Sequence, residues 1–429
     1  MPAPRHRPRV RTAVARVRRW PWRTIVNRGL LGIAALQVTA ATALTLTDRH
    51  RKRGRPAPDL APGDLREVTT GDGDRITVYT YGQDAYDAML EAIEGAQFSI
   101  ALESFIWKGD ETGQQFKEAL IRAAQRGVEV RLVWDRFANL VVDPRFFRFP
   151  QHPKLHVQPH PLVSGGLGFF LPQHWGRNHR KLLVVDEHTA FTGGYNLGSL
   201  YATDWRDTHA RIVGPSVAEL ANAFEDYWNA TKAGRKSPLP DSSDRGWLPS
   251  LRVQRNVPPR WVFPIRYMYL EAIDRASERV WLTHAYLIPD DDLMHVLLKA
   301  VQRGVDVRII VPADSNHVVA DWLSRGYYDR LLVGGVRLFL YQDAMVHAKT
   351  ATIDGQWSTI GTANLDRLSL MGNYEVNIEV IDPALAQRME EVFEADLERC
   401  VEVDLARWRR RRVWKRATEA ILAPLRPLL

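Results

Sequence analysis

The sequence of 429 residues predicts an α/β protein made of one domain in two copies: two mixed sheets flanked by helices and related by a pseudo-twofold axis, preceded by a hydrophobic N-terminal helix. Three observations predict this fold. The chain is longer than a single average domain. One succession of strand, helix and strand occurs twice, and a pattern beginning with histidine recurs 168 residues later. A repeat of that length is too long for a solenoid and indicates a duplicated domain.

Composition limits the class of protein. Hydrophobic residues make up 45% and charged residues 25%, which is enough for a packed core and excludes wholesale disorder. The single cysteine, Cys400, excludes an intramolecular disulfide and metal sites built on cysteines. We expect Cys400 to be a buried or half-buried residue of a helix.

The net charge of +8 is unevenly distributed along the chain. Residues 1–55 carry a net +13 and residues 407–429 a net +7, which leaves −12 on residues 56–406. An enzyme of nucleic acids is expected to carry its positive charge on the body that contacts phosphates. An acidic body with basic ends therefore argues against a nucleic-acid partner and favours an anionic membrane.

The basic N-terminal segment, residues 1–55, contains the predicted membrane helix. Gly29–Thr47 has no charged residue and is long enough to span the hydrocarbon core. A secretory signal peptide and a buried or interfacial helix are the alternatives. Basic residues on both flanks favour a retained anchor in the cell membrane, but they leave its orientation open.

The first half is predicted over residues 70–233 and the second over residues 251–404. Residues 234–250, rich in Pro, Gly, Ser and charge, form the predicted linker. In each half an apolar strand precedes an amphipathic helix that ends at a glycine and leads into a second strand. The first strands are Phe98–Trp107 and Arg279–Ile288, the helix–strand units are Ala119–Asp135 and Leu297–Pro312, and the glycines are Gly127 and Gly304. This order is typical of a parallel α/β arrangement.

The closest internal match begins at two histidines. His179-Arg-Lys-Leu-Leu-Val-Val-Asp186 recurs as His347-Ala-Lys-Thr-Ala-Thr-Ile-Asp354. Each copy is predicted to form a β-hairpin, then another strand and a helix, at Val217–Ala233 and Ala384–Cys400. The same spacing of 168 relates further polar residues, namely Asn196 to Asn364 and Asp207 to Glu375.

The repeated residues suit chemistry on a phosphodiester. Residues i and i+2 of a strand face the same side, so His179 projects with Lys181 and His347 with Lys349. If the pseudo-twofold axis brings the hairpins together, the ammonium groups offset phosphoryl charge. One imidazole can then attack phosphorus while the other protonates the departing alkoxide. We expect neither a metal nor another cofactor, because side chains supply the cations.

Other repeated residues have supporting or open roles. Asp207 and Glu375 are candidates to bond the second ring nitrogen of each histidine and fix its tautomer. Asp186 and Asp354 lie near the hairpin turns, where a structural role is as plausible as a chemical one. The asparagines, Asn196 and Asn364, either bond substrate oxygens or satisfy the loop backbone.

HRKLLVVD…GGYN and HAKTATID…GTAN resemble the duplicated HxKxxxxD…GxxN motif of the phospholipase D superfamily, and the resemblance covers roughly residues 75–400. It implies that His179 and His347 are the catalytic pair and that Asp207 and Glu375 orient them. The implied phosphate-binding residues are Lys181, Lys349, Asn196 and Asn364. The small hydroxyl residue of the family motif is matched by Thr362 as a further substrate-binding residue, whereas copy one has Gly194. This asymmetry favours His179 as nucleophile and His347 as acid and base.

Within the superfamily, the sequence is most similar to bacterial cardiolipin synthases of the phospholipase D type. The similarity lies in the hydrophobic N-terminal segment, VHAKT, ANLDRLSLMGNYEVN and the basic tail. It implies transfer of a phosphatidyl group from one phosphatidylglycerol, through phosphohistidine, to a second, with release of glycerol. The alternatives are a phosphodiesterase that hydrolyses lipid or, less plausibly, nucleic acid, and a non-catalytic membrane scaffold. The acceptor alcohol, the donor head group and the oligomeric state stay open.

Two further segments are consistent with a lipid substrate. Leu162–Pro172 is apolar and rich in glycine, so it either dips into the bilayer to admit acyl chains or packs against the core. The basic tail, residues 405–429, combines arginines with two tryptophans and an apolar end. It is predicted to be an interfacial helix on anionic phospholipid or a solvated tail with a packed stripe.

Overall fold

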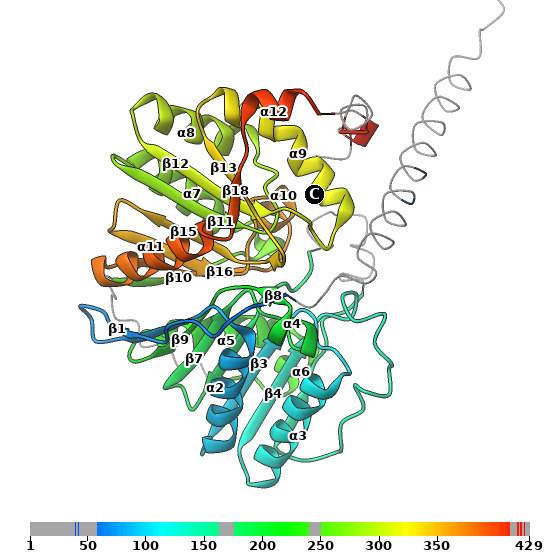
Figure 1. Ribbon diagram of the computed structural model, residues 1–429. Helices are drawn as coiled ribbons and strands as arrows, with labels where there is room; N and C mark the ends of the chain where they lie inside the picture. The colour runs from blue at the N-terminus through cyan, green and yellow to red at the C-terminus, as the bar shows by residue number, and fades with distance from the viewer. Residues whose placement is uncertain are drawn as a thin grey trace, which may run out of the picture.

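The computed structural model describes residues 58–162, 176–239 and 250–411, together with positions 39, 42, 418, 419, 421, 422 and 424. These residues form two mixed sheets, one in each half of the chain, flanked by helices (Figure 1). The predicted fold class is therefore confirmed. The predicted N-terminal helix Gly29–Thr47 lies outside the described residues except for Thr39 and Thr42, as does most of Leu162–Pro172 and of the linker.

Most elements of the first half recur in the same order in the second. The first half contains β1 (Glu67–Thr69), β2 (Arg75–Tyr79), α2 (Gly82–Gly95), β3 (Ser99–Ser104), α3 (Glu111–Gln125), β4 (Glu129–Trp134), β5 (Leu155–Val157), β6 (Leu182–Val185), β7 (Thr189–Gly193), α4 (Ser199–Thr203), β8 (Trp205–Arg206), β9 (His209–Val213), α5 (Val217–Ala230) and α6 (Lys232–Lys236). The second half contains β10 (Leu251–Arg255), η3 (Pro258–Arg260), α7 (Pro264–Arg275), β11 (Arg279–His284), α8 (Asp291–Gln302), β12 (Asp306–Pro312), α9 (Val318–Val333), β13 (Arg337–Tyr341), β14 (Met345–Val346), β15 (Lys349–Ile353), β16 (Trp357–Gly361), α10 (Arg367–Met371), β17 (Val376–Ile381), α11 (Pro383–Leu397), β18 (Cys400–Glu402) and α12 (Leu405–Arg409).

Sheet topology shows the duplication directly. The first sheet has the order β1-β2-β9-β7-β6-β3-β4-β5, and the second β10-β17-β16-β15-β11-β12-β13-β18. Strands β3, β4 and β5 pair in parallel, as do β11, β12 and β13, and the other neighbours are antiparallel. The sheets differ at their edges, where β1 extends one and β18 the opposite edge of the other, and helix α9 between β12 and β13 has no counterpart between β4 and β5 among the described residues.

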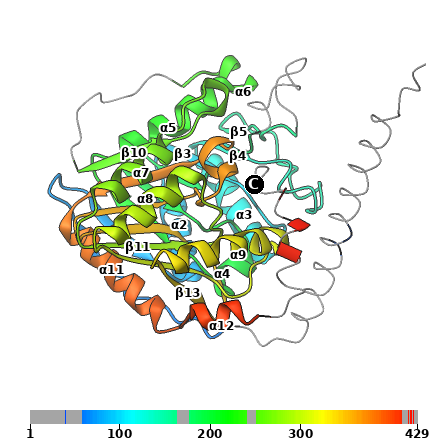
Figure 2. The same ribbon diagram turned by 90° about the horizontal axis from the view of Figure 1, so that it is seen from above.

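The two sheets meet through an apolar layer. Buried side chains of β2, β6 and β9 form one hydrophobic cluster with those of β10, β16 and β17. Helix α5 contacts β10 of the other half, and α11 contacts β1. Helices α2 and α3 cover the outer side of the first half, while α7 and α8 lie side by side over the second (Figures 1 and 2). One packed body therefore brings the two histidine hairpins together.

Local signals explain where the repeated helices begin and end. The Asp110 carboxylate accepts a hydrogen bond from Gly113 N at the start of α3, and that of Asp290 accepts one from Leu293 N at the start of α8. Both helices are followed by a glycine at positive φ, Gly127 at 101° and Gly304 at 89°. The predicted helix terminators are thus confirmed.

Some predicted boundaries were wrong. The strands expected to reach Trp107 and Ile288 end at Ser104 and His284. Helix α6 (Lys232–Lys236) overlaps the start of the predicted linker, whose bounds stay a prediction. Helix α11 ends at Leu397, so Cys400 is not in a helix but opens strand β18. Cys400 is half-buried, and its thiol donates to Asp396 O at 3.1 Å.

The described part of the tail packs onto the second half. Trp408 of α12 lies with its ring centroid 5.2 Å from that of Tyr328 in α9, and Arg409 pairs with Asp329. Leu422 is fully buried in a cluster with residues of α9. These contacts agree with the packed alternative, and the interfacial helix stays a prediction. Within the described part of the chain, none of the helices has both the length and the apolar character to cross a bilayer.

Candidate active site

Both motif histidines lie where the two halves meet. The backbone N–H of His179 donates to Tyr374 O at 3.0 Å, and that of His347 donates to Arg206 O at 2.6 Å. Each bond crosses from one half to the other, and the short strand pair β8–β14 crosses beside the second bond. The backbone of each half therefore fixes the position of the other half's histidine.

The carboxylates that bond the histidines are also exchanged between the halves. His179 Nδ1 lies 2.9 Å from Glu375 Oε2, and His347 Nδ1 lies 2.5 Å from Asp207 Oδ2. A carboxylate accepts here, so each Nδ1 carries the hydrogen and each Nε2 keeps a lone pair. The sequence predicts both carboxylates, but the equal spacing does not show that each one belongs to the opposite histidine.

The two lysines are buried beside their own histidines. Lys181 Nζ donates to His179 O at 2.8 Å, and Lys349 Nζ donates to His347 O. Burial, aided by the charge of Lys349, lowers the pKa of Lys181 to about 7, and burial lowers the pKa of Lys349 to about 8. The ammonium groups lack sufficient compensating charge, which an anionic phosphodiester would supply.

The titratable groups form one electrostatic unit. Burial and then the two lysines lower the pKa of both His179 and His347 well below the usual value, which keeps the imidazoles neutral. Burial raises the pKa of Asp207 and of Glu375, and the charges of Lys181 and Lys349 oppose that rise. Because each lysine acts on both histidines, the four side chains share one site. A neutral imidazole with a free Nε2 lone pair is the form that can attack phosphorus.

Aromatic rings fix the remaining freedom of the imidazoles. The centroid of Phe105 lies 4.6 Å from that of His179, with the planes at 74°, and that of Trp205 lies 4.9 Å from that of His347. Sequence reasoning missed both aromatics. Phe105 follows β3 directly and Trp205 stands two residues before Asp207, so their proximity to repeated residues was the available signal.

Thr362 and Gly194 occupy equivalent positions with different contacts. The fully buried hydroxyl of Thr362 donates to Glu375 Oε2 at 2.5 Å and accepts from Val376 N at 3.0 Å. A Cβ at Gly194 would lie 1.9 Å from Asp207 Oδ1, so this position must be glycine to admit the carboxylate. The structure thus places the Thr362 hydroxyl on the carboxylate that holds His179 and not on an open face of the site.

The asparagines are buried beside the histidines. Asn196 Oδ1 accepts a hydrogen bond from Ile106 N at 3.1 Å, so its amide oxygen holds the loop backbone. Asn364 Oδ1 has no hydrogen-bond partner among the described residues. The Asn196 amide oxygen therefore follows the loop-backbone alternative, and binding of substrate by the asparagines stays a prediction.

Asp186 and Asp354 lie at the hairpin turns and bond backbone. The Asp186 carboxylate accepts from the N–H groups of residues 97, 98 and 99, and Asp354 accepts from those of residues 277, 278 and 279. Both aspartates have positive φ, 51° and 53°. They tie each turn to the start of the neighbouring strand.

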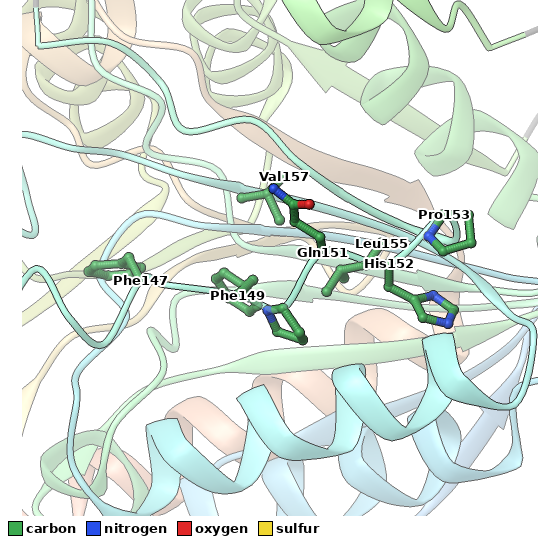
Figure 3. A pocket seen from close by; sticks show the side chains of 8 residues that line it. Phe147, Phe149, Gln151, His152, Pro153, Leu155 and Val157 are labelled. Atoms are coloured by element: carbon green, nitrogen blue, oxygen red, sulfur yellow. The ribbon is translucent and has the colours of Figure 1, made fainter.

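A groove of about 540 Å³ lies along edge strand β5 of the first sheet (Figure 3). It is lined by Phe147, Phe149, Pro150, Gln151, His152, Pro153, Leu155 and Val157. None of the predicted site residues lines this groove, so the chemistry is assigned to the histidine pair instead.

Comparison with known proteins agrees with this geometry. A family model described as "Cardiolipin synthase, PLD-like domain" matches residues 89–228 and 269–397, one match in each half. The major cardiolipin synthase ClsA of Bacillus subtilis is 30% identical over 368 residues, covering 82% of this chain and 75% of that protein. Cardiolipin synthase A of Pseudomonas entomophila is 32% identical over 330 residues, covering 75% and 68%.

Solved structures share the fold. Phosphatidylserine synthase of Haemophilus influenzae aligns with a TM-score of 0.62 at 15% identity, covering 90% of this chain and 97% of that one. Polyphosphate kinase of Porphyromonas gingivalis aligns with a TM-score of 0.51 at 16% identity, covering 82% and 52%. At these identities the likeness concerns the fold alone.

Proposed function

Because the chain belongs to the phospholipase D superfamily, in the family of cardiolipin synthases with phospholipase D-like domains, we propose that it forms cardiolipin from two molecules of phosphatidylglycerol and releases glycerol. The observation that carries the chemistry is the pair of exchanged histidine–carboxylate contacts, with one lysine beside each histidine. This arrangement provides a nucleophile, a proton donor and charge stabilisation without any further group.

In the first step Nε2 of His179 attacks the phosphorus of one phosphatidylglycerol. A phosphorus–nitrogen bond forms and the bond to the head-group glycerol oxygen breaks. His347, protonated when the anionic substrate offsets the two lysine charges, donates its Nε2 proton to that oxygen, and glycerol leaves. Glu375 takes the hydrogen bond of the His179 Nδ1–H as positive charge develops on the ring.

In the second step a hydroxyl of another phosphatidylglycerol attacks the phosphohistidine. His347 Nε2 removes the proton of that hydroxyl while the phosphorus–nitrogen bond breaks, which regenerates the neutral His179 imidazole and the protonated His347. Lys181, Lys349 and the NH₂ groups of Asn196 and Asn364 bind the non-bridging phosphoryl oxygens in both steps.

Product analysis tests the reaction. Purified protein incubated with phosphatidylglycerol vesicles is expected to yield diphosphatidylglycerol and glycerol in equal amounts. Phosphatidic acid and glycerol without a diphosphatidyl product would instead establish hydrolysis. The His179→Ala and His347→Ala variants are expected to lose turnover, and unchanged turnover would contradict the assignment.

Both substrates are bilayer lipids, so the enzyme works at a membrane. Residues 29–47 form its anchor, and the positive charge of residues 1–55 attracts anionic lipid. A chain that lacks residues 1–55 is expected to leave the membrane fraction after carbonate washing. Full retention of the shortened chain would refute the anchor.

A further inference from the structure

One loop near the site exposes several large apolar side chains. In the connection between β4 and β5, Phe137 is 57% exposed, Leu140 62% and Val141 84%. We call residues Arg136–Val142 the rim loop. Scattered exposed apolar residues are ordinary, but three within five positions form a patch that indicates a binding surface.

Buried hydrogen bonds hold the rim loop in place. The Asn139 side chain, 5% exposed, donates to Phe105 O at 2.8 Å and accepts from Trp107 N at 2.9 Å. Asp135 accepts from Phe137 N at 2.8 Å. Since the Phe105 ring packs on His179, the rim loop is fixed directly beside the histidine that attacks phosphorus.

The second half continues the patch. Leu368 and Met371 of α10 are exposed, and α10 begins three residues after Asn364. Arg177 connects the two parts, because its backbone N–H donates to Asn373 Oδ1 at 3.0 Å and its guanidinium lies 5.6 Å from the Phe137 ring centroid. Apolar side chains from both halves therefore border one edge of the site.

The charge beside the apolar patch, and the lack of such a patch in the equivalent loop of the second half, indicate the kind of partner that this surface binds. Exposed Arg136 begins the rim loop and exposed Arg367 begins α10, so positive charge flanks the apolar patch. The equivalent loop after β12 is polar, Asp314-Ser315-Asn316-His317. Apolar tips bordered by arginine fit the interface of an anionic bilayer, where the tips enter the acyl region and the arginines meet phosphates.

We propose that the rim loop and α10 form the surface by which the catalytic body sits on anionic lipid, with Phe137, Leu140 and Val141 inserted among the acyl chains. This inference rests on the proposed function, because a lipid substrate is what gives the surface its role. The phosphate of a lipid reaches His179 while the acyl chains stay in the bilayer along the rim loop.

Site-specific labelling tests insertion independently of turnover. In the full chain carrying Cys400→Ser, an environment-sensitive fluorophore is attached at Val141→Cys or, as control, at Phe98→Cys. Phe98 is 76% exposed and precedes β3, at the opposite end of that strand from Phe105. On reconstitution into phosphatidylglycerol–phosphatidylcholine vesicles containing nitroxide lipids, we expect a blue shift and quenching at position 141 only. An unchanged signal at 141, or equal quenching at 98, would overturn the proposal.

Kinetics provide a second test. The double variant Leu140→Asp with Val141→Asp is expected to lower kcat/KM on vesicles at least about tenfold, because two apolar anchors are lost. Activity on short-chain phosphatidylglycerol below its micellar concentration should stay unchanged, as should both activities in Phe98→Asp. An equal loss on the soluble lipid would place the defect inside the site and refute insertion. If the protein makes no cardiolipin at all, the proposed function fails and the labelling result alone decides this inference.

Discussion

At the residue scale, the buried lysines make anion binding depend on pH. The pKa values of Lys181 and Lys349, about 7 and about 8, lie below the usual value because burial disfavours the charged form. A bound dianion favours that form and raises both pKa values. Binding near pH 8 should therefore take up protons, and affinity should fall as the pH rises above 7.

Sulfate is a suitable probe because it does not titrate in this range. Calorimetry in two buffers of different ionisation enthalpy is expected to show uptake of about one proton at pH 8. The Lys181→Met variant should take up less. Affinity that does not change between pH 6 and pH 9 would contradict the lowered pKa values.

Thr362 is predicted to act through Glu375. Thr362→Val removes a hydrogen bond to a buried carboxylate, so kcat is expected to fall about tenfold or more. KM should change little, and Thr362→Ser should restore kcat. Steady-state kinetics distinguish the two roles of Thr362. A rise in KM with unchanged kcat would mean that Thr362 binds the lipid itself.

At the element scale, Asp186 and Asp354 hold each hairpin turn against the start of a strand. Asp186→Ala removes the acceptor of three backbone hydrogen bonds and leaves an alanine at positive φ. The free energy of unfolding is expected to fall by about 2–4 kcal/mol. Asp186→Asn should cost less, because asparagine tolerates this backbone conformation.

Urea titration measures this loss, and the turnover of the molecules that remain folded should be close to normal. A large fall in kcat for Asp186→Ala without a change in unfolding would instead give the aspartate a chemical role.

The repeated elements could be predicted from hydrophobic periodicity and local signals. A glycine such as Gly127 or Gly304 ends a helix through its own backbone conformation, which depends only on residues close to it in sequence. Strand β18 was missed, since Cys400 enters a strand only through pairing with β13, a distant segment. The exchanged carboxylates could not be read from the spacing either. A repeat shows which residues are equivalent, but the contact between His179 and Glu375 joins residues 196 positions apart.

At the scale of the whole molecule, a buried ion pair joins the two halves next to the residues that hold His347. Arg206 of β8 pairs with Asp396 of α11 at 2.7 Å, and both side chains are buried. Arg206 O accepts the backbone hydrogen bond of His347, and Asp207 follows it in sequence. The ion pair therefore supports both the histidine and its carboxylate.

Asp396→Ala is expected to lower the free energy of unfolding by about 3–5 kcal/mol, because Arg206 stays buried without its partner. The kcat value should fall as well, since β8 positions Asp207. As a control, Glu402→Ala removes the exposed pair with Arg337 and should cost less than about 1 kcal/mol. Equal losses in thermal unfolding for the two variants would contradict a special role for the buried pair.

The exchange of carboxylates also makes each half depend on the other. Among the described residues, the carboxylate that bonds each imidazole comes from the opposite half. A substitution at Thr362 therefore acts on His179 across the interface through Glu375, and a side chain at Gly194 would displace Asp207 from His347.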